Sequence, residues 1–220
     1  MRVSAVVLGL ITVFFIGGVA FAQGDNKYYS EYCFKHKLND KFDLFFTPEL
    51  RFKDDMGDLY YYHLRLGAAF HAHKNLDLAV AYRFIQNKAN GDWSNNNVEY
   101  VETLVIPKMK LGGFDISDAN KLERRFYENA PDRWVYRNLL TFAYPAKIGT
   151  FEFIPYVSNE VYYDFEVGKA NLDWITLGAN KRINKNLMVG LYYRAEISRA
   201  GSSSEWVTNQ VLGSNVSVDF

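Results

Sequence analysis

RWVYRNLLTFAY, the stretch from Arg133 to Tyr144, separates into two surfaces when every second residue is read. One surface carries Arg133, Val135, Arg137, Leu139, Thr141 and Ala143, and the other carries Trp134, Tyr136, Asn138, Leu140, Phe142 and Tyr144. A repeat of two residues predicts a β-strand, because successive side chains of a strand point to opposite faces of the sheet. The pattern fits a soluble sheet with its apolar face inside, and equally a membrane barrel with its apolar face outside.

The same alternation recurs along the chain and predicts eleven extended segments. These are Tyr28–Leu38, Phe42–Phe52, Tyr60–Ala72, Leu76–Phe84, Val98–Lys110, Lys121–Tyr127, Arg133–Tyr144, Phe151–Tyr163, Leu172–Ile183, Leu187–Ile197 and Trp206–Phe220. Short connections alternate with longer polar ones, which is typical of an all-β, up-and-down antiparallel transmembrane β-barrel. Because bacterial single-chain barrels have even strand numbers, eleven segments leave the count open between ten and twelve. Glu99 and Glu102 fall on opposite faces of their segment, so we expect a bulge or a shifted boundary there.

The N-terminus has the features of an export signal. Arg2 precedes an apolar run from Val3 to Val19, and the small residues Ala20 and Ala22 flank a cleavage point. This pattern predicts a secretory signal peptide at residues 1–22. The alternation beyond it predicts a single outer-membrane β-barrel domain at residues 23–220. The alternative is a retained transmembrane anchor, since the run is just long enough to span a bilayer. No other apolar run has spanning length, so the mature chain is expected to enter a membrane as a barrel and not as helices.

Composition narrows the class of protein further. The chain has 25 Lys and Arg residues and 25 Asp and Glu residues, so its formal net charge is zero. This balance argues against electrostatic binding to nucleic acid. Aromatic residues make up 17% of the chain, as expected for a strand-rich protein. The single cysteine, Cys33, excludes an intramolecular disulfide.

The spacing of aromatic and charged residues indicates which face is inside. Trp134 and Tyr144 share one face ten residues apart, which on a tilted strand projects to roughly 25 Å, the height of the apolar band of an outer-membrane barrel. Charged residues on the other face would cost ~2–4 kcal/mol each if they faced lipid near the midplane. We therefore expect the aromatic face to meet outer-membrane lipid and the charged face to line the lumen. The predicted lumen-lining charged residues are Glu49, Arg51, Arg65, Asp77, Arg83, Lys121, Glu123, Arg125, Arg133, Arg137, Glu160, Arg194 and Glu196.

The chain ends within a strand pattern on Phe220, with Val216 and Val218 on the same face. This ending resembles the C-terminal signal by which bacterial outer-membrane barrels are recognised by the barrel-assembly machinery. Phe220 is therefore the predicted assembly signal, and that machinery is an expected partner during biogenesis.

Three segments carry a family resemblance. They are NKLERRF (Asn120–Phe126), WVYRNLLTFAYP (Trp134–Pro145) and PYVSNEVYYDF (Pro155–Phe165). They resemble an uncharacterised family, a domain of unknown function, of bacterial outer-membrane barrels. The resemblance covers most of the mature chain and implies the fold and a location in the bacterial outer membrane, but no activity. The sequence departs from the family pattern at Trp174, where a basic residue is expected.

Candidate catalytic residues are few. A lipid-modifying enzyme would need a nucleophile and a base close together, and the candidates are His36, His63, His71, His73 and Ser158. His63 lies on the predicted lumen face, where an ordinary polar role is favoured over that of a general base. His71 and His73 could share a metal ion, but no Cys, Asp or Glu cluster accompanies them in the sequence. We therefore predict no catalytic, cofactor or metal site.

Three functions fit this pattern. A barrel of ten to twelve strands is barely wider than the side chains inside it, so charge pairs would close it and favour a structural or interaction barrel. A narrow channel for small polar solutes is the alternative, followed by a lipid-modifying enzyme. Side-chain packing in the lumen decides between the first two functions, and the oligomeric state is left open.

Overall fold

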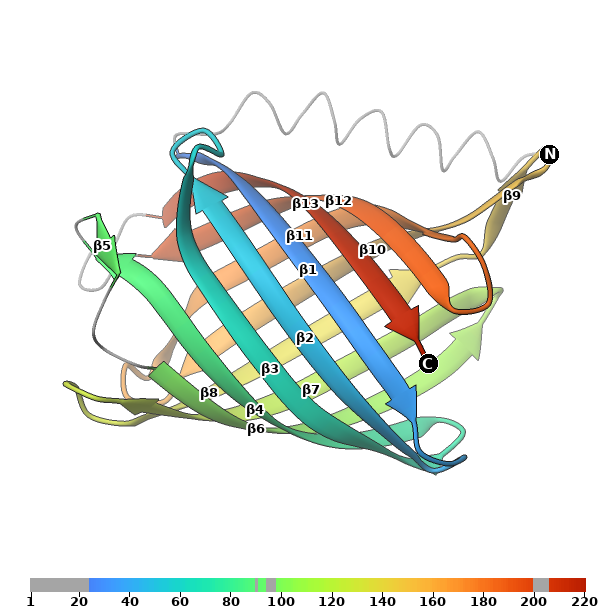
Figure 1. Cartoon of the computed structure of the whole chain (residues 1–220), viewed down its shortest axis with the longest axis horizontal. Helices are drawn as coiled ribbons and strands as arrows, with labels where there is room; N and C mark the ends of the chain where they lie inside the picture. Colours follow the sequence, from blue (N-terminus) through green and yellow to red (C-terminus); the bar gives the residue numbers. More distant parts are fainter. Residues whose placement is uncertain (1–23, 90, 94–97, 200–205) are drawn as a thin grey trace.

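The structure is a computed structural model, and it describes residues 24–89, 91–93, 98–199 and 206–220. Eleven long strands form the wall of a barrel (Figure 1). They are β1 (Asn26–Lys37), β2 (Phe42–Lys53), β3 (Asp58–His73), β4 (Leu76–Ala89), β6 (Val98–Leu111), β7 (Phe114–Tyr127), β8 (Arg133–Ala143), β10 (Phe151–Asp164), β11 (Lys169–Arg182), β12 (Leu187–Arg199) and β13 (Trp206–Asp219). Two short strands extend the wall: β5 (Asp92–Trp93) pairs with β4, and β9 (Ala146–Ile148) pairs with β10. The predicted signal peptide lies outside the described residues.

The barrel closes through one parallel pair of strands. Each long strand pairs antiparallel with the next long strand along the chain, whereas β1 and β13 run parallel, from Asn26 opposite Gln210 to Lys35 opposite Asp219. An odd number of strands that alternate up and down must place the first and last in the same direction. The predicted up-and-down barrel of ten to twelve strands is thus confirmed with eleven strands, and the parallel seam is the feature that the alternation did not indicate.

The two ends of the barrel differ in their connections. One end carries short turns, such as Lys74-Asn75 between β3 and β4 and Gly112-Gly113 between β6 and β7. This short-turn end also holds the C-terminus, where the amide of Phe220 donates to the carbonyl of Lys35 at 2.8 Å. The other end, called here the long-loop end, carries the β2–β3, β4–β6, β7–β8, β10–β11 and β12–β13 connections and the start of β1.

The expected irregularity in β6 was wrong. Its register with β4 runs without a shift from Leu76 opposite Pro107 to Ile85 opposite Val98. Glu102 is fully buried in the lumen, and Glu99 lies on the outer face close to the long-loop end. A carboxylate at the rim can reach water, so an outward-facing charge there does not require a bulge.

Side chains are distributed inside out relative to a soluble protein. Large apolar side chains on the outer face are strongly exposed, including Leu66 at 60%, Val80 at 57% and Leu191 at 67%. The lumen face holds the buried charged residues together with glycines that make room for rings. A Cβ on Gly67 would lie 2.3 Å from the Phe45 ring, and one on Gly213 would lie 2.0 Å from the Tyr192 ring. No helix in the described part of the chain is long and apolar enough to cross a bilayer.

Candidate functional site

The lumen contains an extended network of ion pairs. Glu102 on β6, fully buried, lies at its centre. Its carboxylate accepts from Arg65 Nε at 2.8 Å and pairs with Arg83 Nη2 at 2.5 Å. Lys121 Nζ from β7 approaches to 3.9 Å. Cations from three strands therefore surround one carboxylate.

A second part of the network is centred on Arg137 of β8. Its Nη1 donates to Glu123 at 2.7 Å, and its Nη2 donates to Glu160 at 2.5 Å. Glu123 also accepts two bonds from Arg125, at 2.9 and 2.6 Å. Arg137 thus links β7 to β10 through β8, and all four groups have charged partners.

Aromatic rings complete the network on the side of β2, β3, β11 and β12. The Arg51 guanidinium lies 4.2 Å from the Tyr61 ring centroid and 5.2 Å from that of Trp174, and it pairs with Glu49. Arg194 lies 4.2 Å from the Trp174 centroid. Such contacts between a cation and a ring face are attractive, more so where water is excluded. The residue that departs from the expected family pattern is therefore a packing centre for arginines.

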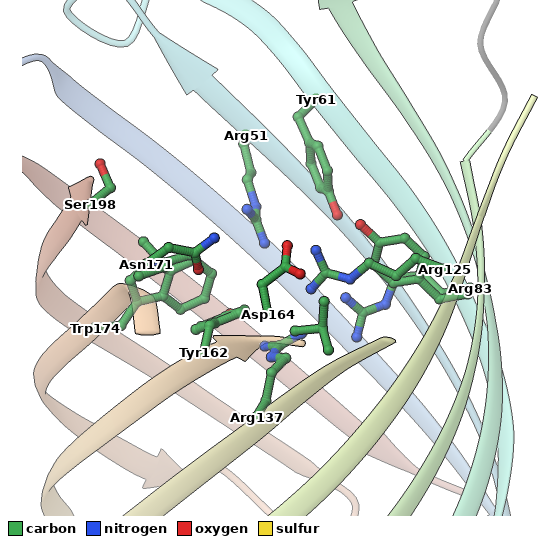
Figure 2. A pocket seen from close by; sticks show the side chains of 13 residues that line it. Arg51, Tyr61, Arg83, Arg125, Arg137, Tyr162, Asp164, Asn171, Trp174 and Ser198 are labelled. Atoms are coloured by element: carbon green, nitrogen blue, oxygen red, sulfur yellow. The ribbon is translucent and has the colours of Figure 1, made fainter. Parts of the chain in front are cut away.

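Two neighbouring cavities of the lumen meet at this network. The outer cavity, of about 310 Å³, lies toward the long-loop end and is shown in Figure 2. The inner cavity, of about 330 Å³, lies deeper and contains Glu31, His63 and Ser158 in its wall. The same four side chains line both: Arg51, Arg83, Arg137 and Trp174. These four residues, called here the dividing layer, lie between the cavities.

The structure places the thirteen predicted charged residues as follows. Glu49, Arg51, Arg65, Arg83, Lys121, Glu123, Arg125, Arg137, Glu160, Arg194 and Glu196 point into the lumen. Asp77 lies near the short-turn end, paired with His71 at 2.9 Å and Lys108 at 2.7 Å. Arg133 lies at the long-loop rim, where its side chain is 43% exposed and 3.5 Å from Asp164.

Several lumen residues were missed by the sequence analysis. Glu102 was missed because Glu99 obscured the alternation of its strand, although Tyr100 and Leu104 on the same face could have indicated it. Lys27 pairs with Glu196 at 2.5 Å, and the Tyr29 hydroxyl donates to the same carboxylate at 2.8 Å. Both lie at the start of β1, a segment whose role the pattern left open.

The candidate histidines lie in different surroundings, and His63 shares the wall of the inner cavity with Ser158. His63 is buried, and its Nδ1 lies 3.2 Å from the Tyr61 hydroxyl. His71 is held between Asp77 and Asp43, at 2.9 and 3.0 Å, while His36 and His73 are exposed. Within the described residues, no group of three or more His, Cys, Asp or Glu side chains could hold a metal ion.

Comparison with known proteins identifies the family. The family model described as "Protein of unknown function (DUF2490)" matches residues 26–206. The chain belongs to this family. No curated protein matches the sequence.

Two solved structures share the fold of this DUF2490 protein. LpxR from Salmonella typhimurium is similar with a TM-score of 0.54, covering 86% of this chain and 87% of its own, at 10% identity. A bacterial polysaccharide outer membrane secretin is similar with a TM-score of 0.52, covering 83% of this chain and 66% of its own, also at 10% identity. At this identity the similarity concerns the fold alone, and that fold is an outer-membrane barrel.

Proposed function

We propose that this DUF2490 protein is a structural or interaction barrel of the bacterial outer membrane, with a lumen closed by paired charge. In this proposal residues 1–22 are a cleaved signal peptide, the outer apolar face contacts lipid, and the long-loop end presents the binding surface. The fold of its structural neighbours, the exposed apolar outer face and the charged interior support the location.

The dividing layer is the observation that favours a closed lumen over a channel. Arg137 is held by two carboxylates, and Arg51 is held by Glu49 and packed between the Tyr61 and Trp174 rings. Side chains fixed by both ion pairs and ring contacts cannot swing aside without leaving buried charges unpaired, which costs several kcal/mol. A solute that entered the lumen from the long-loop end would therefore meet a fixed obstruction.

Single-channel recording in planar bilayers tests this proposal. The unmodified protein is expected to give no steady conductance, whereas a double variant Arg137→Ala, Trp174→Ala is expected to give a measurable leak, because two of the four residues of the layer are shortened. Large, steady openings in the unmodified protein would overturn the closed lumen and establish the channel alternative.

A further inference from the structure

The outer cavity is lined by far more positive than negative groups. Its wall includes the dividing-layer arginines Arg51, Arg83 and Arg137, together with Arg125. The carboxylate in this wall is that of Asp164. Asp164 Oδ1 already accepts from the backbone amides of Glu166 and Val167 at 2.9 and 3.3 Å, in the β10–β11 turn. The cavity wall therefore presents four guanidinium groups and a single carboxylate, that of Asp164, which lies among the labelled arginines in Figure 2.

The strand geometry explains this separation of charge. On β2, Arg51 follows Glu49 by two residues, and on β7, Arg125 follows Glu123 by two residues. Both strands run toward the long-loop end, so residues two apart share a face and the arginine lies nearer to that end. The carboxylates of Glu49 and Glu123 consequently lie on the short-turn side of the cavity, while the guanidinium groups of Arg51 and Arg125 face it.

Two buried donors in the same wall have no acceptor. Arg83 is 6% exposed and its Nε has no hydrogen-bond partner, and Trp174 is 5% exposed and its Nε1 has none. An unsatisfied buried donor is unfavourable, more so when it is charged, so such groups are rare in proteins. Both residues line the outer cavity beside three further guanidinium groups, and this concentration of donors favours a ligand that carries acceptor oxygens.

We infer that the outer cavity is a binding site for a small oxyanion, a phosphate or carboxylate group that enters from the long-loop end. A planar guanidinium group matches the oxygens of both anions with paired N–H donors. The cavity volume of about 310 Å³ lies at the lower end of the range of small-molecule sites, roughly 300–1,000 Å³. The Tyr61, Tyr100 and Tyr162 rings in the wall supply apolar surface for the uncharged part of such a solute.

Calorimetric titration of the detergent-solubilised full chain tests the inference. The probes are inorganic phosphate and D-glucuronate, which separate a phosphate from a carboxylate ligand, and glucose serves as the neutral control. At least one anion is expected to bind with a dissociation constant of about 1 mM or below, and glucose is expected to give no heat of binding.

The variants place the binding in this cavity. Arg83→Lys retains a charge for Glu102 but loses the Nε donor, and it should weaken anion binding at least tenfold. Trp174→Phe retains a ring for the arginines but loses Nε1–H, and it should weaken binding several-fold. Arg65→Lys is the matched control, because Arg65 pairs with the same Glu102 but lines only the inner cavity, and binding should change less than twofold.

The outcome is decisive either way once each variant has been shown to be folded by its heat-dependent mobility on a gel. No anion binding to the unmodified chain, binding of glucose equal to that of the anions, or equal loss in Arg83→Lys and Arg65→Lys would overturn the site. If Arg83→Lys fails to fold, Trp174→Phe decides. The proposal that the lumen is closed is tested separately, because conductance and anion binding are independent measurements.

Discussion

At the scale of single residues, Arg137 shows how the lumen is held together. Its guanidinium group donates to Glu123 and Glu160 and lies 4.2 Å from the Tyr162 ring centroid. A buried ion pair contributes little net stability compared with apolar residues, since its charges must be desolvated. Removing one partner is a different matter, because it leaves the other charge buried and unpaired.

Arg137→Ala is therefore expected to destabilise the folded barrel by about 3–5 kcal/mol. The measurement is the temperature at which the folded band converts to the unfolded band on a gel, which should fall clearly below that of the unmodified protein. Arg133→Ala is the control, since its pair with Asp164 is 3.5 Å long and its side chain is 43% exposed; partly exposed pairs contribute ~0–1 kcal/mol. Equal effects of the two variants would contradict a buried network around Arg137.

A second residue-scale prediction concerns Asp25, just before β1. Its carboxylate accepts from the backbone amides of Asp54 at 2.8 Å and Asp55 at 3.1 Å. Asp54, Asp55 and Met56 have φ values of 51°, 56° and 68°, in the left-handed region that residues other than glycine seldom occupy. Asp25 thus supports an unfavourable turn between β2 and β3.

Asp25→Ala is expected to loosen this turn and increase trypsin cleavage at the adjacent Lys53, measured on folded protein in detergent. Asp40→Ala is the control, because its carboxylate lies in a turn at the opposite end and pairs only at the surface with Lys37. Cleavage that rises equally in both variants would mean that Asp25 has no special role in the turn.

At the scale of the strands, the β1–β13 seam is distinctive. It is the parallel pair of the described barrel, and it joins the strands nearest the two ends of the chain. A parallel pair of strands is slightly less stable per residue than an antiparallel pair. Phe220 follows β13 at the short-turn end with its side chain 68% exposed, and its amide completes the seam through Lys35. The exposed side chain therefore contributes little to the finished barrel.

Phe220→Ala keeps the backbone bond and tests the proposed assembly signal. Full burial of a Phe side chain is worth only ~1.5–3 kcal/mol, so refolding in detergent should be nearly unchanged. The amount reaching the outer membrane in cells should fall several-fold, measured by fractionation and immunoblot. Phe42→Ala, an outward-facing residue at the same end with 42% exposure, should have little effect on that amount. Similar losses for the two variants would mean that Phe220 acts only in packing.

At the scale of the whole molecule, the inverted distribution of side chains predicts membrane residence. The outer face exposes apolar side chains all round the barrel, while charged residues are buried within it. Such a surface is stable in lipid or detergent and would aggregate in water. The protein should fractionate with outer membranes and migrate differently on a gel before and after boiling. Recovery of the mature chain in the soluble periplasmic fraction would contradict this prediction.

The strands and their two faces were predictable because both are local properties. Each segment shows a period of two residues. Charged residues on one face and aromatic residues on the other, such as Arg137 and Trp134, indicate which face points into the lumen. The lumen position of most charged residues follows from the same alternation. The prediction was wrong for β6 because Glu99 lies at the rim, and sequence does not show how deep in the membrane a residue lies.

The remaining features depend on distance through space and were decided by the tertiary structure. The parallel seam follows from closing an odd number of strands, which no single strand encodes. The width of the barrel and the stagger of strands far apart in sequence decide which side chains meet. They determine which carboxylates Arg137 binds and why several arginines pack against Trp174. They also determine which donors are left without acceptors. Alternation therefore determined which residues face the lumen, and only the closed barrel determined which of them meet there.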